Sequence, residues 1–336
     1  TEQLEAPNLD DRYGAEGAYR NVLITSEIAR RLRSTGEKSI KVRSPLTCQA
    51  QKGVCQMCYG LTETGKVPRI GYHIGALAGQ TLGEFSTQLT MRQFHTGGSI
   101  GGQTLGGFDR IRQIMEMPQS IKGKAVLSHE TGVVTKIVTA PAGGKFVYVG
   151  QNKHFVPQEL GVRVAQGDRV KAGDQISKGG VIKPQELLET TGDIHKVREY
   201  LINELDTNYR AAGNVVSRKI YETVVKPLTD RCTITDTGDG SRFFPVHAGE
   251  VVAVNRVEEW NRKLEAQRLR LIKFEPMVMG IKQAPLQSED FIGTLTHEKL
   301  KRTLMDAPSL GKATDLKQGH PMARLALTNL RSIEAV

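Results

Sequence analysis

Four side chains of different chemistry stand at the relative offsets of one helix face, zero, three, four and seven: Gln88, Met91, Arg92 and His95. Residues at these offsets lie on the same side of an α-helix. A thioether can pack against a flat apolar ring, a guanidinium can hold phosphate oxygens through paired hydrogen bonds, and an imidazole can donate to a phosphate or a leaving group. The set therefore suits a ligand with a flat apolar part and a phosphate part. Spacing alone leaves an ordinary surface face, with a solvated Arg and a capped His, as the alternative.

A glycine-rich segment follows these four residues. Six of the eleven positions from Gly97 to Gly107 are glycine, and glycine gives the backbone more conformational freedom than any other residue. A lid that folds over a substrate and then releases it needs such freedom. Beyond the glycines, apolar residues at helical spacing predict a second helix over 108–117. Residues 67–118 are therefore predicted to form a helical hairpin around a mobile loop.

Three of the four cysteines are crowded into one short segment. Cys48, Cys55 and Cys58 have the spacing C-x6-C-x2-C, and a C-x2-C pair can present two thiolates to one tetrahedral zinc ion. This crowding indicates intracellular metal binding rather than a disulfide framework. Structural zinc requires four ligands, and only three are local. Cys232 is a distant candidate for the fourth, and cysteines that only pack, without zinc, are the other alternative.

The surrounding elements are expected to form several modules. A chain of 336 residues is too long for one small core, so two to three packed modules are predicted. The predicted fold class is α+β and multi-module, with a zinc-knuckle segment, a helical hairpin, a small β barrel or sandwich, and C-terminal helices. The predicted boundaries are an N-terminal arm and helix over 1–40, the zinc segment over 41–66, the hairpin over 67–118, the β module over 119–190 and the C-terminal region over 191–336.

Apolar periodicity predicts individual elements in the first part of the chain. A short helix is predicted around Leu32, and the alternating residues 40–43 predict a short strand. The first helix of the hairpin is expected over 70–95. The glycine at its centre allows a break near Gly83 to Ser86.

The rest of the chain alternates between strand and helix signals. Apolar pairs separated by Gly, Pro, Asn and Asp predict short strands over 120–182. Two helical stripes are predicted within 191–226, and Pro227 is expected to end the second. A charged surface helix is predicted over 256–270 and a last helix over 288–305.

Composition limits the classes of protein. The formal net charge is +10 at pH 7, which suits a polyanionic partner such as nucleic acid, although the excess is spread along the chain. No run of about 18 apolar residues occurs, so no membrane span is expected. Residues 1–11 are polar and acidic, unlike a secretory signal. The first residue is Thr rather than Met, which suggests trimming, processing or a start further upstream.

The four spaced residues belong to a longer pattern. The string from Ile70 to Gly98, IGYHIGALAGQTLGEFSTQLTMRQFHTGG, closely resembles the trigger-loop region of the largest (beta-prime) subunit of bacterial-type multisubunit DNA-directed RNA polymerases. Its most specific parts are the blocks 87–92 and 94–98. Residues 67–118 are therefore called the trigger hairpin below. Further segments also resemble the family, so that the resemblance covers nearly the whole chain: 107–116, 209–213 and 279–291.

The resemblance implies a role for each position in nucleotidyl transfer. Gln88 would lie near the ribose of the incoming nucleoside triphosphate (NTP). Leu89 and Met91 would pack by its base. Arg92 and His95 would approach its phosphates, and in the family this helix closes on a correctly paired NTP. His95 is thus a candidate acid or electrostatic stabiliser, although positioning is expected to dominate because phosphoryl transfer depends chiefly on geometry and electrostatics.

Several positions depart from the family pattern. The family has Glu and Ala where Tyr72 and His73 stand, Pro-Gly where Phe85 and Ser86 stand, and Thr where Gln93 stands. Loss of Pro-Gly is expected to alter the hinge beneath the helix. The nucleotide-facing residues are kept, so the resemblance implies an active enzyme with unusual loop dynamics. The departures favour a divergent, phage-encoded enzyme.

The resemblance extends to the cysteines and the β module. Residues 44–60 resemble the second zinc site of beta-prime, where the fourth cysteine lies well upstream of this segment. A fourth ligand from another chain is therefore expected. Cys232 falls where the family has no ligand, so a buried or surface thiol is expected there. Residues 120–182 resemble the jaw region, with a barrel-sandwich fold.

Two parts of the family's catalytic apparatus do not occur in this sequence. The metal-chelating loop Asn-Ala-Asp-Phe-Asp-Gly-Asp is absent, and residues 236–241 have only a superficial likeness to it. The bridge helix is absent too. Polymerisation needs carboxylates that hold Mg2+, so the expected partners are a chain with the N-terminal part of beta-prime, a beta-like subunit, template DNA, RNA and NTPs. A split gene or a cleaved subunit would explain this division.

The resemblance also implies a place of action and leaves one competing interpretation. A polymerase subunit is expected in the cytoplasm, which is that of the bacterial host if the gene is phage-encoded. The competing interpretation is a non-catalytic protein that binds zinc and nucleic acid and modulates a host polymerase. That protein would inhibit transcription in trans without assembling stoichiometrically.

Overall fold

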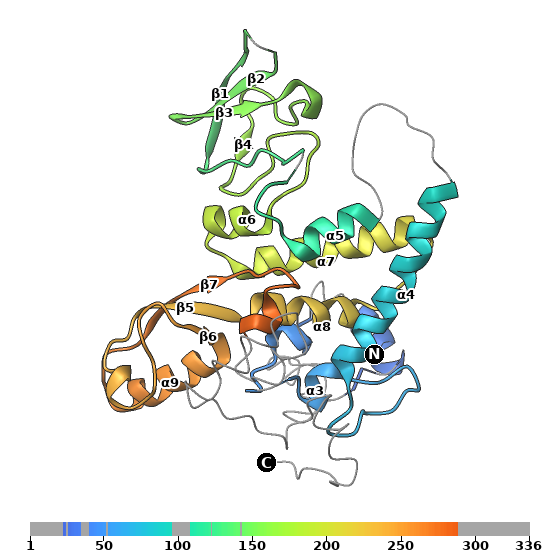
Figure 1. Cartoon of the computed structure of the whole chain (residues 1–336), viewed down its shortest axis with the longest axis vertical. Coiled ribbons are helices and arrows are strands. Elements are labelled where there is room, and N and C mark those ends of the chain that lie inside the picture. The colour runs from blue at the N-terminus through green and yellow to red at the C-terminus, as the bar shows by residue number, and fades with distance from the viewer. Residues whose placement is uncertain are drawn as a thin grey trace, which may run out of the picture. The chain divides into compact units, whose positions relative to one another are not determined.

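The computed structural model describes residues 23–24, 26–34, 40–51, 53–95, 108–121, 123–141 and 143–287, with only the backbone from Phe85 to His95 and at Phe108. The described residues form a mixed α/β structure with two antiparallel sheets (Figure 1), which confirms the predicted combination of helices and strands. It divides into two compact units. Unit 1 comprises residues 1–78, 222–226 and 288–336, and unit 2 comprises residues 79–221 and 227–287. The finer module boundaries stay predictions.

Unit 1 begins with the predicted short helix, which is α2 (Ser26–Ser34). The strand predicted over 40–43 is wrong, because Val42 makes only an isolated β-bridge. The extended segment is cut short at Ser44. This residue caps the 3-10 helix η1 (Pro45–Thr47), and its hydroxyl accepts a hydrogen bond from the N–H of the second residue of that helix.

The first arm of the trigger hairpin is α4 (Ile74–His95), a single continuous helix. The break that the sequence allowed near Gly83 to Ser86 is absent. A single glycine weakens a helix by about 1 kcal/mol without interrupting its hydrogen bonds. Phe85 also keeps the backbone N–H that a proline at this position would lack.

Replacing Gly83 by alanine is expected to stabilise the protein by about 0.5–1 kcal/mol. Gly83 is exposed, and no atom lies within 4 Å of the place where a Cβ would stand, so alanine adds helix propensity without a clash. Urea unfolding followed by circular dichroism measures the change. Gly249→Ala is the matched control, because that site is equally open but its φ of +81° strains alanine. A loss of stability in Gly83→Ala would contradict a continuous α4.

The second arm of the trigger hairpin is α5 (Phe108–Glu116), as predicted. The first sheet follows, with the strand order β3-β2-β1-β4 and every pair antiparallel. Its strands are β1 (Gly132–Thr139), β2 (Lys145–Val149), β3 (Asn152–Val156) and β4 (Arg169–Val170). This sheet confirms the predicted β character of 120–182.

A tight turn and an apolar cluster define the register of this sheet. Val149 pairs with Asn152 across a two-residue hairpin loop, and Gly150 in that loop has a φ of +56°, which such loops require. The buried cluster of the sheet is aliphatic: Val134, Val147, Val149, Val156, Val170 and Ile176. A shift by one residue would turn these side chains to solvent.

Three helices follow the sheet in sequence. α6 (Pro184–Thr191) was not predicted, although proline at its first turn is a helix-start signal. α7 (Ile194–Ala211) and α8 (Arg218–Thr229) correspond to the two predicted helical stripes. The prediction that Pro227 ends α8 is wrong, since the helix continues to Thr229. Only two helical residues follow the proline, so it disturbs no more than the last turn.

The second sheet has the antiparallel order β6-β5-β7. Its strands are β5 (Arg231–Asp236), β6 (Val251–Ala253) and β7 (Lys273–Met277). β7 is an edge strand, which is where Pro276 can be tolerated. The predicted charged helix is α9 (Val254–Ala266) and ends earlier than expected, because Arg268 takes a φ of +56° and the helix does not continue.

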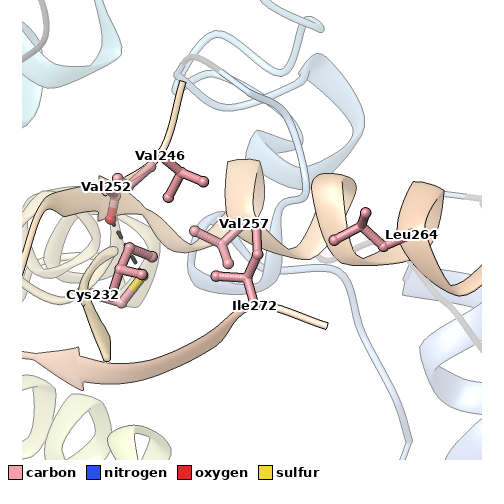
Figure 2. Close-up of a cluster of buried hydrophobic side chains, with 7 residues drawn as sticks. Cys232, Val246, Val252, Val257, Leu264 and Ile272 are labelled. Atoms are coloured by element: carbon pink, nitrogen blue, oxygen red, sulfur yellow. Dashed lines mark hydrogen bonds between the residues drawn. The ribbon is translucent and has the colours of Figure 1, made fainter. Parts of the chain in front are cut away.

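Buried side chains of this sheet and α9 form one cluster (Figure 2). Its members are Cys232, Ile234, Val246, Val252, Val257, Leu264 and Ile272. The Cys232 thiol donates a hydrogen bond to the carbonyl oxygen of Val252 (3.4 Å), and burial raises its pKa to about 12. Of the two expected possibilities for Cys232, a buried or a surface thiol, the structure shows the buried one.

The described elements also include three further 3-10 helices: η2 (Gln158–Leu160), η3 (Gly240–Arg242) and η4 (Ala284–Gln287). The helix predicted over 288–305 lies outside the described residues. None of the helices that the structure describes combines the length and apolar character needed to cross a membrane.

Candidate functional site

Cys48, Cys55 and Cys58 come together in unit 1. Their Sγ atoms all lie within 4.8 Å of one another. The local backbone explains this proximity, because Cys48 directly follows η1 and Cys55 caps the N-terminus of α3 (Gln56–Tyr59), which carries Cys58. The structure thus brings together the three residues that the spacing predicted as a metal-ligand group.

Hydrogen bonds to sulfur order this cluster. The N–H of Cys55 donates to Cys48 Sγ (3.3 Å), the N–H of Cys58 donates to Cys55 Sγ (3.4 Å), and Arg43 Nη1 donates to Cys58 Sγ (3.7 Å). A hydrogen bond from the Cys58 thiol lowers the pKa of Cys48 to about 5, and the same contact raises the pKa of Cys58. Negative charge is therefore stabilised on sulfur, the form in which a thiol binds a metal ion.

Residues 222–226 of α8 belong to the same unit and support the cysteine segment. Lys226, which is 8% exposed, donates through Nζ to the carbonyl oxygen of Cys48 (3.0 Å). Glu222 accepts a hydrogen bond from the hydroxyl of Ser44 (2.8 Å). These bonds hold the segment on both sides of η1.

The donor set fits zinc. A Zn–S bond of about 2.3 Å in a tetrahedron separates two sulfurs by roughly 3.8 Å, so small side-chain rotations suffice from the present arrangement. Zinc would cross-link η1 to α3 at this point. Among the described residues, no fourth His, Cys, Asp or Glu joins the group. The alternative that Cys232 completes the site finds no support, since Cys232 is packed in the cluster of Figure 2.

The residues predicted to face a nucleotide lie in the second half of α4. The backbone is helical from Ile74 to His95, and offsets of zero, three, four and seven on a helix share one side. The side chains concerned lie outside the part of the chain that the structure describes: Gln88, Leu89, Met91, Arg92 and His95. Their roles therefore stay predictions.

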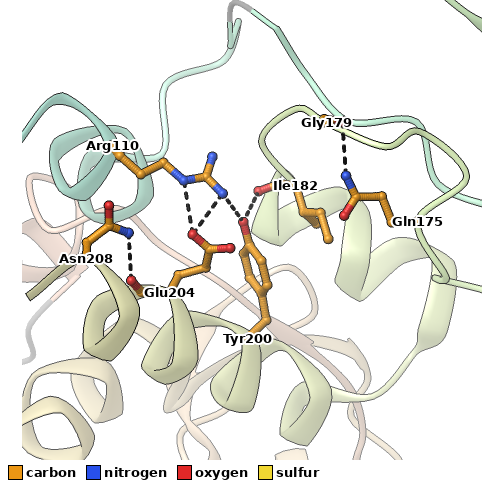
Figure 3. A network of polar contacts seen from close by, with 7 residues as sticks. All are labelled: Arg110, Gln175, Gly179, Ile182, Tyr200, Glu204 and Asn208. Atoms are coloured by element: carbon orange, nitrogen blue, oxygen red, sulfur yellow. Dashed lines mark hydrogen bonds and ion pairs between the residues drawn. The ribbon is translucent and has the colours of Figure 1, made fainter. Parts of the chain in front are cut away.

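A polar network between α5 and α7 escaped the sequence analysis (Figure 3). Arg110 of α5 donates to Glu204 of α7 through Nε (3.1 Å) and Nη2 (2.9 Å), and Nη2 also donates to the hydroxyl of Tyr200 (3.0 Å). Tyr200 in turn donates to the carbonyl oxygen of Ile182 (3.1 Å). The available signal was an Arg inside an apolar helical stripe together with a Tyr and a Glu four residues apart.

α7 also contacts the first arm of the trigger hairpin. The Tyr209 hydroxyl donates to the carbonyl oxygen of Leu82 in α4 (2.9 Å), and both residues are buried. Tyr209 stands in one of the segments that resemble the polymerase family, but its partner could not be read from the sequence.

The acidic loop after β5 is structural. Asp236 accepts hydrogen bonds from the N–H of Gly238 (3.0 Å) and from Arg270 Nη2 (2.6 Å), and the first of these is the main cause of its lowered pKa. Asp239 accepts from the N–H of Arg270 (2.9 Å). Both carboxylates therefore stabilise a turn. This agrees with the expectation that residues 236–241 resemble a magnesium-binding loop only superficially.

Comparison with known proteins points to the same family as the sequence patterns. The profile of the family described as RNA polymerase Rpb1, domain 5, matches residues 23–288. "DNA-directed RNA polymerase subunit beta'" of Caldanaerobacter subterraneus subsp. tengcongensis is 32% identical over 320 residues, covering 94% of this chain and 26% of that protein. The subunit of the same name from Ureaplasma urealyticum serovar 10 is 35% identical over 329 residues, covering 94% and 25%.

The chain spans about a quarter of the length of these curated relatives. Its family match, in contrast, extends over most of the described residues and includes the cysteine segment, both arms of the trigger hairpin and both sheets. The chain therefore belongs to the RNA polymerase Rpb1 domain 5 family and corresponds to a C-terminal portion of the beta' subunit.

Proposed function

We propose that this chain is a working part of a DNA-directed RNA polymerase and that α4 closes on the incoming NTP. The unbroken α4 carries this proposal, because one continuous helix can present the predicted contacts from one rigid element, with Gln88, Met91, Arg92 and His95 on one face and Leu89 beside it. Those contacts are substrate binding by Gln88 and Leu89, and catalysis by Met91, Arg92 and His95. Closure would hold the triphosphate while the RNA 3′ hydroxyl attacks its α-phosphate and pyrophosphate leaves.

The magnesium ions of this reaction would be held by a partner chain. Asp236 and Asp239 stand in the acidic loop whose sequence is most similar to a magnesium-binding motif, and both accept hydrogen bonds from Arg270. We therefore assign the metal-chelating loop to a chain with the N-terminal part of beta', working with a beta-like subunit, template DNA, RNA and NTPs. The complex would act in the cytoplasm, that of a bacterial host if the gene is phage-encoded.

A structural zinc ion at Cys48, Cys55 and Cys58 forms the second part of the proposal. Three thiols within 4.8 Å of one another support it. The fourth ligand would come from another chain. Zinc would then fasten this chain to its partner as well as fix the local backbone.

RNA synthesis by a reconstituted complex is expected to require this chain. Partner subunits alone, with the Asp-rich loop but without this chain, should bind an RNA–DNA scaffold yet extend RNA at least about 100-fold more slowly, since closure and the phosphate contacts are missing. Native mass spectrometry of the purified complex should show stoichiometric assembly. Inhibition in trans without assembly would instead identify the non-catalytic modulator and refute the proposal.

A further inference from the structure

We propose that α7 is the platform that fixes both arms of the trigger hairpin, and that Arg110, Tyr200, Glu204 and Tyr209 are positioning residues for nucleotide addition. This inference rests on the proposed function of α4. All four residues lie in unit 2, together with α5 and the part of α4 from Gly79 onward. None of the four is a predicted contact of the nucleotide.

The second arm is held at its start. Arg110 is in the first turn of α5, is 8% exposed, and makes three hydrogen bonds to Glu204 and Tyr200 (Figure 3). Two of these reach one carboxylate oxygen from two nitrogens, which fixes the direction of the guanidinium as well as its distance. The helix that leaves the loop of the hairpin therefore begins at a defined place on α7.

The far end of α5 is held as well. The N–H of Ile281 donates to the carbonyl oxygen of Met115 (2.7 Å), and Lys282 pairs with Glu116 (3.1 Å). Gly280 lies so close to Glu116 that a Cβ would overlap its carbonyl group. Arg110 holds one end of α5 and residues 280–282 hold the other, so α5 can neither slide nor rotate easily.

The first arm is held from the same platform. The hydroxyl of Tyr209 bonds the carbonyl oxygen of Leu82, at the position in α4 just before the site where the polymerase family has Pro-Gly and this chain has Phe85 and Ser86. Tyr209 is five residues beyond Glu204 on α7, about 7.5 Å along the helix axis. Leu82 and Arg110, which stand on either side of residues 96–107 in the sequence, are thus both bonded to one short stretch of α7.

The network around Arg110 fixes the direction of α5 at a cost in folding stability. Arg110 Nη1 and Gln113 Oε1 are buried and have no hydrogen-bond partner among the described residues. Burying an ion pair with a nitrogen left unsatisfied is costly, and well-packed apolar side chains of similar size commonly stabilise a fold more. A fixed direction for α5 is a benefit that apolar packing would not supply.

The test is single-nucleotide addition on stalled elongation complexes assembled with the full chain. The amplitude of the reaction reports the fraction of correctly assembled complexes, and the rate constant reports the positioning of the nucleotide. Arg110→Gln is expected to lower the rate constant about 10- to 100-fold at unchanged amplitude, because a displacement of about 1 Å can cost that much. Arg110→Lys, which keeps the charge, should recover part of the rate.

Two conservative variants distinguish an effect on nucleotide positioning from a folding defect. Tyr200→Phe and Tyr209→Phe remove one hydroxyl each and keep the buried rings, so both are expected to lower the rate constant about 3- to 10-fold at unchanged amplitude. Arg112→Gln is the matched control. It lies on the same helix, but its side chain is 55% exposed and its ion pair among the described residues is with Asp109, so its rate constant should equal that of the parent.

Three outcomes decide the matter. Lower amplitudes with unchanged rate constants would show that the network only stabilises the fold, and would overturn the inference. The inference would also be overturned if Arg110→Gln and both Tyr variants kept rate constants within twofold of the parent while Arg92→Ala was slow. If Arg92→Ala and His95→Ala were themselves at the parent's rate, the proposed function of α4 would fail instead.

Discussion

His95→Ala and Arg92→Ala are each expected to slow nucleotide addition by the reconstituted polymerase about 100-fold. A positioned acid or phosphate ligand contributes about this much in phosphoryl and acyl transfer. Both residues share the side of α4 that also carries Gln88 and Met91, so losing either should leave the triphosphate misaligned. The rate constant of single-nucleotide addition at saturating NTP measures the effect, and the KM for NTP should change less than the rate constant.

The choice between positioning and proton donation follows from a second variant. His95→Gln keeps a hydrogen-bond donor but cannot supply a titrating imidazole. If positioning dominates, His95→Gln should stay within about 10-fold of the parent and keep its pH profile, because the geometry of the donor survives. A rate as low as that of His95→Ala would instead assign His95 to proton transfer.

Gln93→Ala is the control for these variants. Gln93 follows Arg92 directly, but successive helix positions differ by about 100°, so it lies away from the stripe of Gln88, Met91, Arg92 and His95, on the side of α4 that Leu89 shares. It also stands where the family has Thr. Its rate constant should equal that of the parent. A defect as large as that of Arg92→Ala would mean that the stripe has been assigned to the wrong face.

Cys58→Ser is expected to abolish zinc binding and to unfold the cysteine segment. Cys58 belongs to the group whose sulfurs lie within 4.8 Å of one another, and a serine hydroxyl does not replace a thiolate as a zinc ligand. Since bound zinc contributes about 10–16 kcal/mol to the folding of small zinc domains, even a fraction of that exceeds ordinary single substitutions. Metal analysis should fall from about one zinc per complex to below about 0.1, with faster amide exchange over 48–59.

Two comparisons separate the possible arrangements of this zinc site. Cys232→Ala removes the remaining cysteine, which is buried in the cluster of Figure 2, and should leave the zinc content unchanged. The chain without its partner should hold less zinc than the assembled complex, since the fourth ligand is assigned to the partner. Equal zinc content in both would contradict a shared site, and no zinc in either would mean that the cysteines only pack.

Local sequence patterns determined much of this protein. The spacing of Cys48, Cys55 and Cys58 was enough to predict their grouping, because a short loop with a C-x2-C turn has few ways to place its thiols. The periodic stripes of α5 and α7 were recognised, because an amphipathic helix must bury one face. The string around Gln88 to His95 pointed to the polymerase family, which the match over 23–288 then confirmed.

Tertiary structure decided what local pattern could not. The continuity of α4 and the extension of α8 past Pro227 depend on small energy differences, which packing can outweigh. The edge strand β7 was missed because a strand with a proline has no clear pattern of its own. Its pairing with β5 exists only in the folded chain.

The clearest case is the pairing of α7 with both arms of the trigger hairpin. Arg110 and Glu204, like Tyr209 and Leu82, are far apart in sequence and carry no mark of their partners. The sequence determined which residue types could bond and on which helix faces they lie. Which of them meet is decided by how the helices pack, since a buried polar group is stable only where the fold brings a partner within hydrogen-bonding distance.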